Sequence, residues 1–178
     1  MKTSYSKKSF VPFSQVFLVI NNKVLLLKRK SDKKMWPGKL LGVGGKIEPH
    51  EDLFHGAQRE FHEETGAKLE NISLKGTFSW EDESELSGIN FIFTSTKYSG
   101  KIQHQSDEGE LLWMNINDAL KSDILAPHIP LYLNEILFGK NLYVSHSKFT
   151  EHFNTGDIGD HQSSIEYFDK KLRNVKNK

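Results

Sequence analysis

The segment from residue 51 to residue 65 constrains the fold of this chain more than any other. Its apolar side chains recur at helical spacing and form one stripe: Leu53, Phe54, Ala57 and Phe61. Glu51 and Asp52 suit the first turn of a helix, where acidic groups complement the helix dipole, and Gly66 suits the position just after its end. Such a helix can bury its stripe only against another element, so we expect it to pack on a β-sheet.

Strand-like runs on both sides of this helix supply that sheet. They cover residues 15–20, 24–29, 40–43, 72–80, 89–98 and 111–116. Asn21 and Asn22 tolerate positive φ and predict a tight hairpin between the first two runs. Asn117 or Asp118 is expected to cap a short helix. The remaining expected elements are a helix over residues 127–138 and a strand over residues 140–144. This mixture of elements predicts a mixed α/β domain.

The chain has 178 residues, the length of one domain. We expect a basic N-terminal lead-in over residues 1–13, a single domain over residues 14–140 and a C-terminal extension over residues 141–178. Near its end, the extension keeps three apolar residues at helical spacing: Ile165, Phe168 and Leu172. We therefore expect the extension to pack on the domain or to end in a helix.

Composition excludes several classes of protein. The 24 basic and 23 acidic residues nearly cancel, which disfavours a nucleic-acid coat or a polybasic membrane anchor. No apolar run reaches the roughly 18 residues that span a bilayer, and residues 1–10 lack the apolar core of a secretory signal. The absence of cysteine excludes disulfides and thiolate metal sites. We expect a cytoplasmic protein that binds neither nucleic acid nor membrane.

Three glutamates lie on one face of the expected helix. Glu60, Glu63 and Glu64 are three and four residues apart, so their carboxylates are neighbours. Like charges this close destabilise a helix, and a divalent cation with oxygen ligands would relieve the repulsion. Gly44 and Gly45 let the backbone approach such an ion, so that a carbonyl oxygen can join the ligands. Mg²⁺ is the natural candidate and Mn²⁺ the alternative, whereas the spacing does not point to zinc.

Arg59 follows Glu51 by about two helical turns, so an ion pair between them would stiffen the corner between loop and helix. A glutamate-rich helix taken alone is more often a solvated face, and only the joint spacing favours a metal site. That spacing runs through these positions: Gly45, Glu51, Arg59, Glu60, Phe61, Glu63, Glu64, Gly66 and Ala67. The pattern resembles the Nudix box of the MutT-like Nudix hydrolases, and only Ala67 is smaller than the usual residue.

The resemblance implies a fold and an activity. Nudix hydrolases are α/β/α sandwiches around a mixed β-sheet, and they hydrolyse a pyrophosphate bond in nucleoside diphosphate-linked substrates. The segment PGKLLGVGGKIEP is most similar to the subgroup that acts on nucleoside triphosphates, including oxidised purine nucleotides. The resemblance also implies a small-molecule nucleotide as partner, and a homodimer, which many family members form.

Two alternatives remain open. One is a hydrolase of ADP-ribose or of dinucleoside polyphosphates. The other is a catalytically silent Nudix-fold module that binds a nucleotide for regulation, which the intact glutamates disfavour. A role on RNA lacks a basic patch interleaved with aromatic residues.

Functional residues of the family map onto the box by position. The resemblance assigns metal binding to Gly44, Glu60, Glu63 and Glu64. Glu60 or Glu63 would also orient the attacking water, and Arg59 would support catalysis through its pair with Glu51. The structural positions of the box are Gly45, Glu51 and Gly66.

A carboxylate outside the box often serves as a further ligand or as the general base in this family. Glu108, five residues before Trp113, is the best-placed match, and Glu110 is the second choice. The third choice is the acidic segment that contains Glu81, Asp82, Glu83 and Glu85. A carboxylate placed there would accept the proton of the attacking water.

Lys46 and Lys39 are the cations expected to attract the substrate phosphates, and Leu41 and Trp113 are expected near the base. The oxidised-purine subgroup has an asparagine at the position of Leu41 and an acidic pair where this chain has His128 and the residue after it. Oxidised guanine is therefore not implied as the substrate. Three further aromatic residues could stack on a base, although such residues usually belong to the core: Trp36, Phe78 and Trp80.

Overall fold

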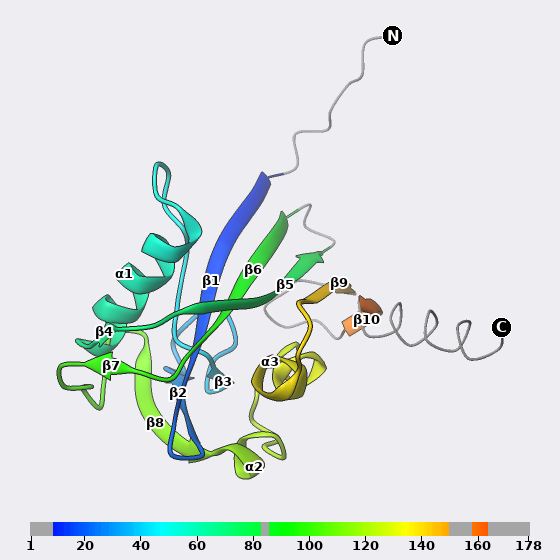
Figure 1. Cartoon of the computed structure of the whole chain (residues 1–178). Helices are drawn as coiled ribbons and strands as arrows, with labels where there is room; N and C mark the ends of the chain where they lie inside the picture. The colour runs from blue at the N-terminus through cyan, green and yellow to red at the C-terminus, as the bar shows by residue number, and fades with distance from the viewer. Residues whose placement is uncertain (1–8, 83–85, 150–157, 164–178) are drawn as a thin grey trace, which may run out of the picture.

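The computed structural model describes residues 9–82, 86–149 and 158–163 (Figure 1). Its strands are β1 (Ser9–Ile20), β2 (Lys23–Arg29), β3 (Leu40–Leu41), β4 (Lys68–Leu69), β5 (Ser73–Glu81), β6 (Leu86–Ser95), β7 (Tyr98–Ser99), β8 (Gly109–Asn115), β9 (Tyr143–Phe149) and β10 (Ile158–Ser163). Its helices are α1 (Leu53–Thr65), α2 (Ile116–Ala119), the 3₁₀ helix η1 (Ile129–Leu131) and α3 (Leu133–Phe138).

β1 lies inside the larger, eight-stranded sheet. The strand order is β10-β9-β5-β6-β1-β2-β3, and β8 also pairs with β2. β1 runs parallel to β6 and β5 runs parallel to β9, whereas β2 pairs antiparallel with β1, β3 and β8. A separate two-stranded sheet joins β4 and β7. The larger sheet is therefore mixed, as expected.

β1 changes partner along one of its edges. Its last two residues pair with β2 through a tight turn at Asn21 and Asn22, whose φ values of 49° and 61° asparagine tolerates. Nearer the start of β1, the loop before α1 takes the place of β2: Val16 and Val43 exchange two backbone hydrogen bonds of 2.7 and 3.0 Å. This exchange holds the loop against the middle of the sheet.

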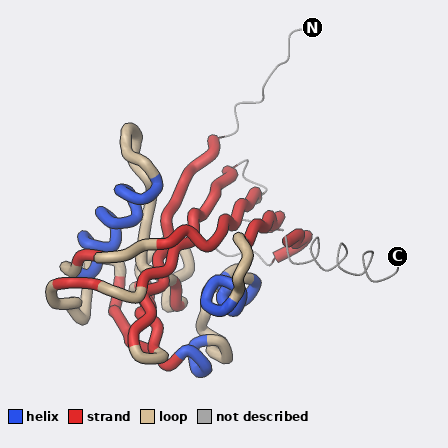
Figure 2. Tube along the Cα trace, viewed as in Figure 1, coloured by secondary structure: helices blue, strands red, loops and turns tan. Residues whose placement is uncertain are grey.

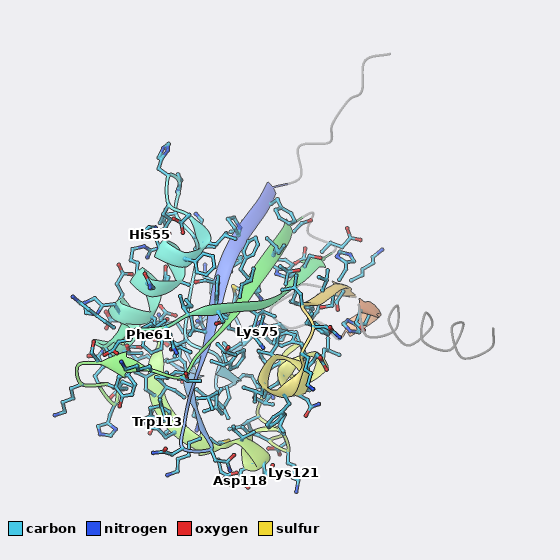
Figure 3. All side chains as sticks on the ribbon, in the orientation of Figure 1. His55, Phe61, Lys75, Trp113, Asp118 and Lys121 are labelled. Atoms are coloured by element: carbon cyan, nitrogen blue, oxygen red, sulfur yellow. The ribbon has the colours of Figure 1, made fainter. Side chains whose placement is uncertain are left out.

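Helices cover both faces of the sheet (Figure 2). On one face, Ala57 and Phe61 of α1 are fully buried in a cluster with Val16, Leu18 and Phe93 of the sheet (Figure 3). On the other face, α2, η1 and α3 pack over a core that contains Phe17, Phe78, Trp80, Ile92, Ile116, Ile129, Leu133 and Ile136. The expected sandwich of helices around a mixed sheet is confirmed.

α1 begins later than its sequence indicated. Asp52 is the N-cap, because its carboxylate accepts hydrogen bonds from the N–H groups of Phe54 (2.8 Å) and His55 (3.0 Å). Placing Glu51 and Asp52 in the first turn was therefore wrong. The expected end is confirmed, since Gly66 follows the helix in a left-handed conformation with φ of 76°. Phe54 is 44% exposed, so the buried stripe is narrower than expected.

Two other helix expectations need correction. Asn115 caps α2 instead of Asn117 or Asp118, because its side-chain oxygen accepts from the Asn117 N–H at 3.0 Å. The single helix expected over residues 127–138 is divided into η1 and α3, since Tyr132 between them has the non-helical φ of −134°.

The sheet extends beyond both boundaries expected for the domain. β1 begins at Ser9, inside the expected lead-in, and pairs with β6 from there. The strand expected over residues 140–144 begins and ends later than expected: it is β9, Tyr143–Phe149, which pairs with β5 and with β10. The helix expected near the C-terminus lies outside the described residues. Within the described ranges, no helix is long and apolar enough to cross a membrane.

Replacing Phe61 with alanine should destabilise the protein by about 3–5 kcal/mol, because it opens a cavity between α1 and the sheet. Phe54→Ala is the matched control, the same change on the same helix at a position that is 44% exposed, and should cost less than half as much. Urea unfolding followed by circular dichroism measures both. Equal losses would contradict the orientation of α1.

Candidate active site

Gly44 and Gly45 lie where the loop before α1 meets both β1 and α1. The Ser14 N–H donates to the Gly45 carbonyl at 2.8 Å. Gly44 has φ of 151°, and a Cβ there would come within 2.3 Å of the Ser14 carbonyl oxygen. A Cβ at Gly45 would come within 2.4 Å of Glu60 Oε2. The close approach of β1 therefore requires glycine at position 44, whereas a side chain at position 45 would displace the Glu60 carboxylate.

α1 directs three glutamates towards this loop. Glu64 is only 6% exposed, and its carboxylate accepts a hydrogen bond from the Gly44 N–H at 3.2 Å. The Glu60 side chain is 16% exposed and that of Glu63 is 58% exposed. All three line one polar cavity of about 780 Å³. The expected clustering is therefore present, but two of the three carboxylates are turned inwards instead of being solvated.

Burial changes the protonation of these groups. It raises the pKa of Glu64 to about 8, and the nearby charge of Glu60 contributes in the same direction. Burial also raises the pKa of Glu60, although Arg59 opposes that shift. Carboxylates held together out of water favour any positive partner that can reach them.

The donor set fits a hard divalent cation. It consists of the three glutamate carboxylates and the carbonyl oxygens of the diglycine turn, and such cations prefer oxygen ligands. In the part of the chain that the structure describes, no three His, Asp or Glu side chains lie close enough together to hold a metal ion by themselves. The case for a divalent cation therefore rests on two features: every available ligand atom is oxygen, and the carboxylates of like charge are partly buried together.

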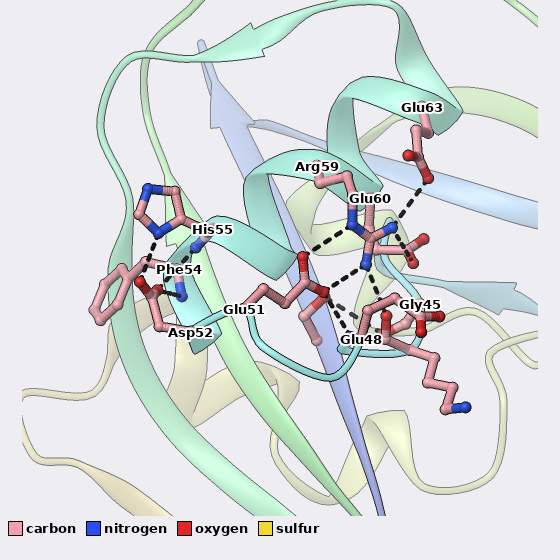
Figure 4. Close-up of polar contacts among 11 residues, drawn as sticks. Gly45, Glu48, Glu51, Asp52, Phe54, His55, Arg59, Glu60 and Glu63 are labelled. Carbon is pink, nitrogen blue, oxygen red and sulfur yellow. Dashed lines mark hydrogen bonds and ion pairs between the residues drawn. The ribbon is translucent and has the colours of Figure 1, made fainter.

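Arg59 connects this cluster to the loop (Figure 4). Its Nη2 and Nε donate to the two oxygens of Glu51 at 2.6 and 3.0 Å, and Nη2 also donates to the Lys46 carbonyl at 3.0 Å. Its Nη1 donates to Glu60 at 2.8 Å and to Glu63 at 3.1 Å. The hydrogen bonds from Arg59 lower the pKa of Glu51 to about 2. The expected pair is present, and the same guanidinium also contacts two of the clustered glutamates.

Glu108 lines the same cavity from the other side. Its carboxylate pairs with Arg29 Nη1 at 2.9 Å and with Lys33 Nζ at 2.7 Å. Glu110 is exposed and does not line the cavity. Asp107 does line it, although sequence reasoning missed this residue. The available signal was its place beside Glu108 in the same acidic segment.

The acidic segment named as third choice lies elsewhere. Glu81 ends β5 and Asp82 is buried, and neither lines the cavity. Glu83 and Glu85 lie outside the described residues.

A second, smaller cavity of about 170 Å³ adjoins the first, and both are lined by Arg29, Gly44 and Gly45. Its walls are largely apolar and include Phe13, Leu27, Met35, Trp36 and Leu41. Gln15 and Asn90 also line it, and sequence reasoning missed both. A polar residue inside an apolar strand becomes informative only when the cavity that it faces is known.

The expected substrate-binding residues fall into two groups. Lys46 lines the polar cavity and Leu41 lines the smaller one. Lys39 and Trp113 line neither of these cavities. Trp113 lies on β8 near Tyr98, with ring centroids 6.4 Å apart (Figure 3).

Aromatic rings surround His128 at the smaller cavity. Its ring stacks on Phe78 at a centroid distance of 5.3 Å and lies 5.5 Å from Trp36. Phe78 and Trp80 are fully buried core residues, whereas Trp36 also lines the cavity. Burial lowers the pKa of His128 to about 3, so its imidazole is neutral at physiological pH.

Comparisons with known proteins place the chain in a family. The family model of the NUDIX domain matches residues 13–134. This chain belongs to the Nudix hydrolase family. The uncharacterized Nudix hydrolase YvcI of Bacillus subtilis is 32% identical over 137 residues, which cover 75% of this chain and 82% of that protein.

One further relative and one solved structure are also similar to this chain. The oxidized purine nucleoside triphosphate hydrolase of Danio rerio is 29% identical, covering 77% of this chain and 85% of the relative. The crystal structure of the MutT protein from Bacillus halodurans matches with a TM-score of 0.76 at 26% identity, covering 87% of this chain and 98% of that one. This Nudix hydrolase is therefore MutT-like in fold.

His128 should make this Nudix hydrolase acid-sensitive. Its pKa is about 3 in the folded state and near 6.5 in the unfolded chain, so the unfolded chain binds the extra proton as pH falls below about 6.5. The free energy of unfolding should then fall by about 2 kcal/mol between pH 7 and pH 5 from this group alone. Denaturant titrations of the wild type and of His128→Phe measure the difference.

His62→Asn is the control, because His62 is an exposed histidine on α1. It should keep the pH dependence of the wild type. A His128→Phe protein with the same pH dependence as the wild type would contradict the neutral, buried imidazole.

Proposed function

We propose that this protein is a metal-dependent hydrolase that cleaves a pyrophosphate bond in a nucleoside triphosphate. The observation that carries the proposal is the joining of two unlike cavities at Gly44, Gly45 and Arg29. One cavity is lined by carboxylates and cations, and the other is largely apolar. Together they suit a molecule that has a polyphosphate at one end and an uncharged ring at the other.

The polar cavity has groups of both signs for such a substrate. Arg29, Lys30 and Lys46 line it and can attract phosphate oxygens, while the glutamates face the same space. A polyphosphate and a cluster of carboxylates repel each other, so binding both in one cavity needs a cation between them. That requirement favours a divalent metal ion as the cofactor.

Glu60, Glu63, Glu64 and the Gly44 carbonyl would hold this ion, for which we propose Mg²⁺, with Mn²⁺ able to replace it. When bound, the ion supplies charge neutralisation at the phosphates and a lowered pKa for bound water. The enzyme's own residues must then place the water and accept its proton.

Glu63 and Glu60 are the candidates for orienting the water. Glu63 is the more exposed of the two, and both carboxylates are held by Arg59 Nη1. A carboxylate fixed in this way can accept the proton as the water attacks phosphorus. Glu108, held by its ion pairs with Arg29 and Lys33, is the second candidate for the base.

The relatives support a nucleoside triphosphate as the substrate class. The Danio rerio protein is named for oxidised purine nucleoside triphosphates. ADP-ribose and dinucleoside polyphosphates remain the second class, and binding without turnover remains the third. The 170 Å³ cavity favours a substrate with one base over one that has a second nucleoside to bury there. Homodimer formation and a cytoplasmic location remain predictions.

Glu63→Gln should lower kcat for nucleoside triphosphate hydrolysis by at least about 100-fold, because a neutral amide is a poor ligand and no proton acceptor. Phosphate or pyrophosphate release over a nucleotide panel, with and without Mg²⁺, measures this effect. Chelation by EDTA should abolish turnover in the wild type, and added Mg²⁺ should restore it.

Glu110→Gln is the matched control, because Glu110 is exposed and lies outside the cavity. It should retain wild-type turnover. Full activity of a folded Glu63→Gln protein, or wild-type turnover in EDTA, would refute the proposed site.

A further inference from the structure

Two amide side chains face the smaller cavity from adjacent strands. β1 and β6 pair in parallel with Phe13 opposite Asn90 and Gln15 opposite Ile92, so Gln15 and Asn90 point to the same face of the sheet. Gln15 is 6% exposed and Asn90 is 8% exposed, and both line the cavity. Buried amides need hydrogen-bond partners, so a ligand that fills this cavity must satisfy them.

Tyr132 fixes which way the Gln15 amide points. The Tyr132 hydroxyl is buried and donates to Gln15 Oε1 at 2.5 Å. Burial raises the pKa of Tyr132, so the phenol keeps its proton and needs an acceptor. Gln15 Oε1 supplies that acceptor, and the Nε2 hydrogens remain for the cavity. Gln15 is therefore a donor with a defined direction.

Gly42 provides the space for this arrangement. A Cβ at Gly42 would come within 2.7 Å of Gln15 Cγ and within 3.1 Å of the Phe17 ring. The glycine therefore lets the Gln15 side chain lie along the wall of the cavity and reach Tyr132.

Apart from Arg29, which also lines the polar cavity, the walls of the smaller cavity carry no charged side chain. His128 is neutral there, and Trp36 and Leu41 give apolar walls. The Asn90 amide makes no side-chain hydrogen bond to another residue within the described ranges, so it can both donate and accept. The cavity thus offers one fixed donor and one adaptable amide to an uncharged planar ring.

We infer that Gln15, oriented by Tyr132, is a specificity-determining residue that selects a nucleobase with an exocyclic carbonyl oxygen over one with an exocyclic amino group. The inference rests on the proposed function, because it places the base of the substrate in the smaller cavity. An amino group opposite Gln15 Nε2 would bring two donors together and leave both unpaired, which discriminates strongly in a buried site.

ITP and ATP form a suitable test pair, because they carry the same ribose and triphosphate and differ in the base at the 6-position and its adjoining ring nitrogen. The wild type should show a kcat/KM for ITP at least about tenfold above that for ATP. Gln15→Met should bring the two values close together, mainly by raising KM for ITP. Gln15→Glu, which replaces the donor by an acceptor, should shift the preference towards ATP.

Tyr132→Phe tests the orientation without changing Gln15. Once Gln15 Oε1 loses its donor, the amide can turn over, so the ratio of ITP to ATP should fall towards one. Gln58→Met makes the same chemical change as Gln15→Met on the exposed face of α1 and should keep the wild-type ratio. Thermal unfolding identifies any variant that fails to fold. If the Gln15 variants do not fold, Tyr132→Phe still tests the inference.

Equal use of ITP and ATP by the wild type would overturn the inference while leaving the hydrolase intact. An unchanged preference in both Gln15→Met and Tyr132→Phe would also overturn it. If the wild type hydrolyses no nucleotide in Mg²⁺, the proposed function fails instead. In that case calorimetry measures the Kd values of ITP and ATP. Tighter binding of ITP by the wild type that is lost in Gln15→Met supports the inference, and equal Kd values for the two nucleotides in the wild type refute it.

Discussion

Arg59 makes the contacts on which the geometry of the candidate site depends. One guanidinium holds the carboxylate of Glu51, the carbonyl of Lys46 and the side chains of Glu60 and Glu63. These groups come from the loop and from α1, which are also joined by the hydrogen bond from the Gly44 N–H to the Glu64 carboxylate. Because guanidinium has donors in a rigid planar fork, it can fix several acceptors at once, which an ammonium group cannot do in the same way.

The split along one edge of β1 explains why two cavities lie side by side. Where β2 leaves β1, the loop at Val43–Gly45 pairs with β1 in its place. The partition between the charged cavity and the apolar one is therefore built partly from backbone, at two glycines that have no side chains to fill either space. Both cavities therefore meet at the same stretch of main chain.

Local sequence patterns were enough to predict the features that depend on neighbours along the chain. The Asn21–Asn22 turn, the end of α1 at Gly66 and the clustering of Glu60, Glu63 and Glu64 follow from turn chemistry and helical periodicity. The cap of α2 was misplaced because Asn115, Asn117 and Asp118 are all good caps, and only the path of β8 decides among them.

Features that depend on distant parts of the chain were not predictable in this way. The burial of Glu64 comes from the docking of a loop, and the pairing of Glu108 with Arg29 and Lys33 joins residues far apart in sequence. Gln15 and Asn90 gave no signal at all, because strand periodicity says which face a residue occupies but not whether a cavity opens there. Trp113 is an error of the opposite kind. It was expected near the base, but it lies on β8 beside Tyr98 and lines neither cavity.

The parallel pairing of β1 with β6 also affects how the molecule assembles. Ser9 to Leu18 must find partners that emerge from the ribosome only after the whole Nudix box, and this pairing forms the largest interface in the sheet. Closing so long a loop is entropically slow, and its cost is recovered only when the strands meet. A nascent chain can thus form the α1 helix early, but neither cavity gains its walls until β6 and the segment around Glu108 have been synthesised.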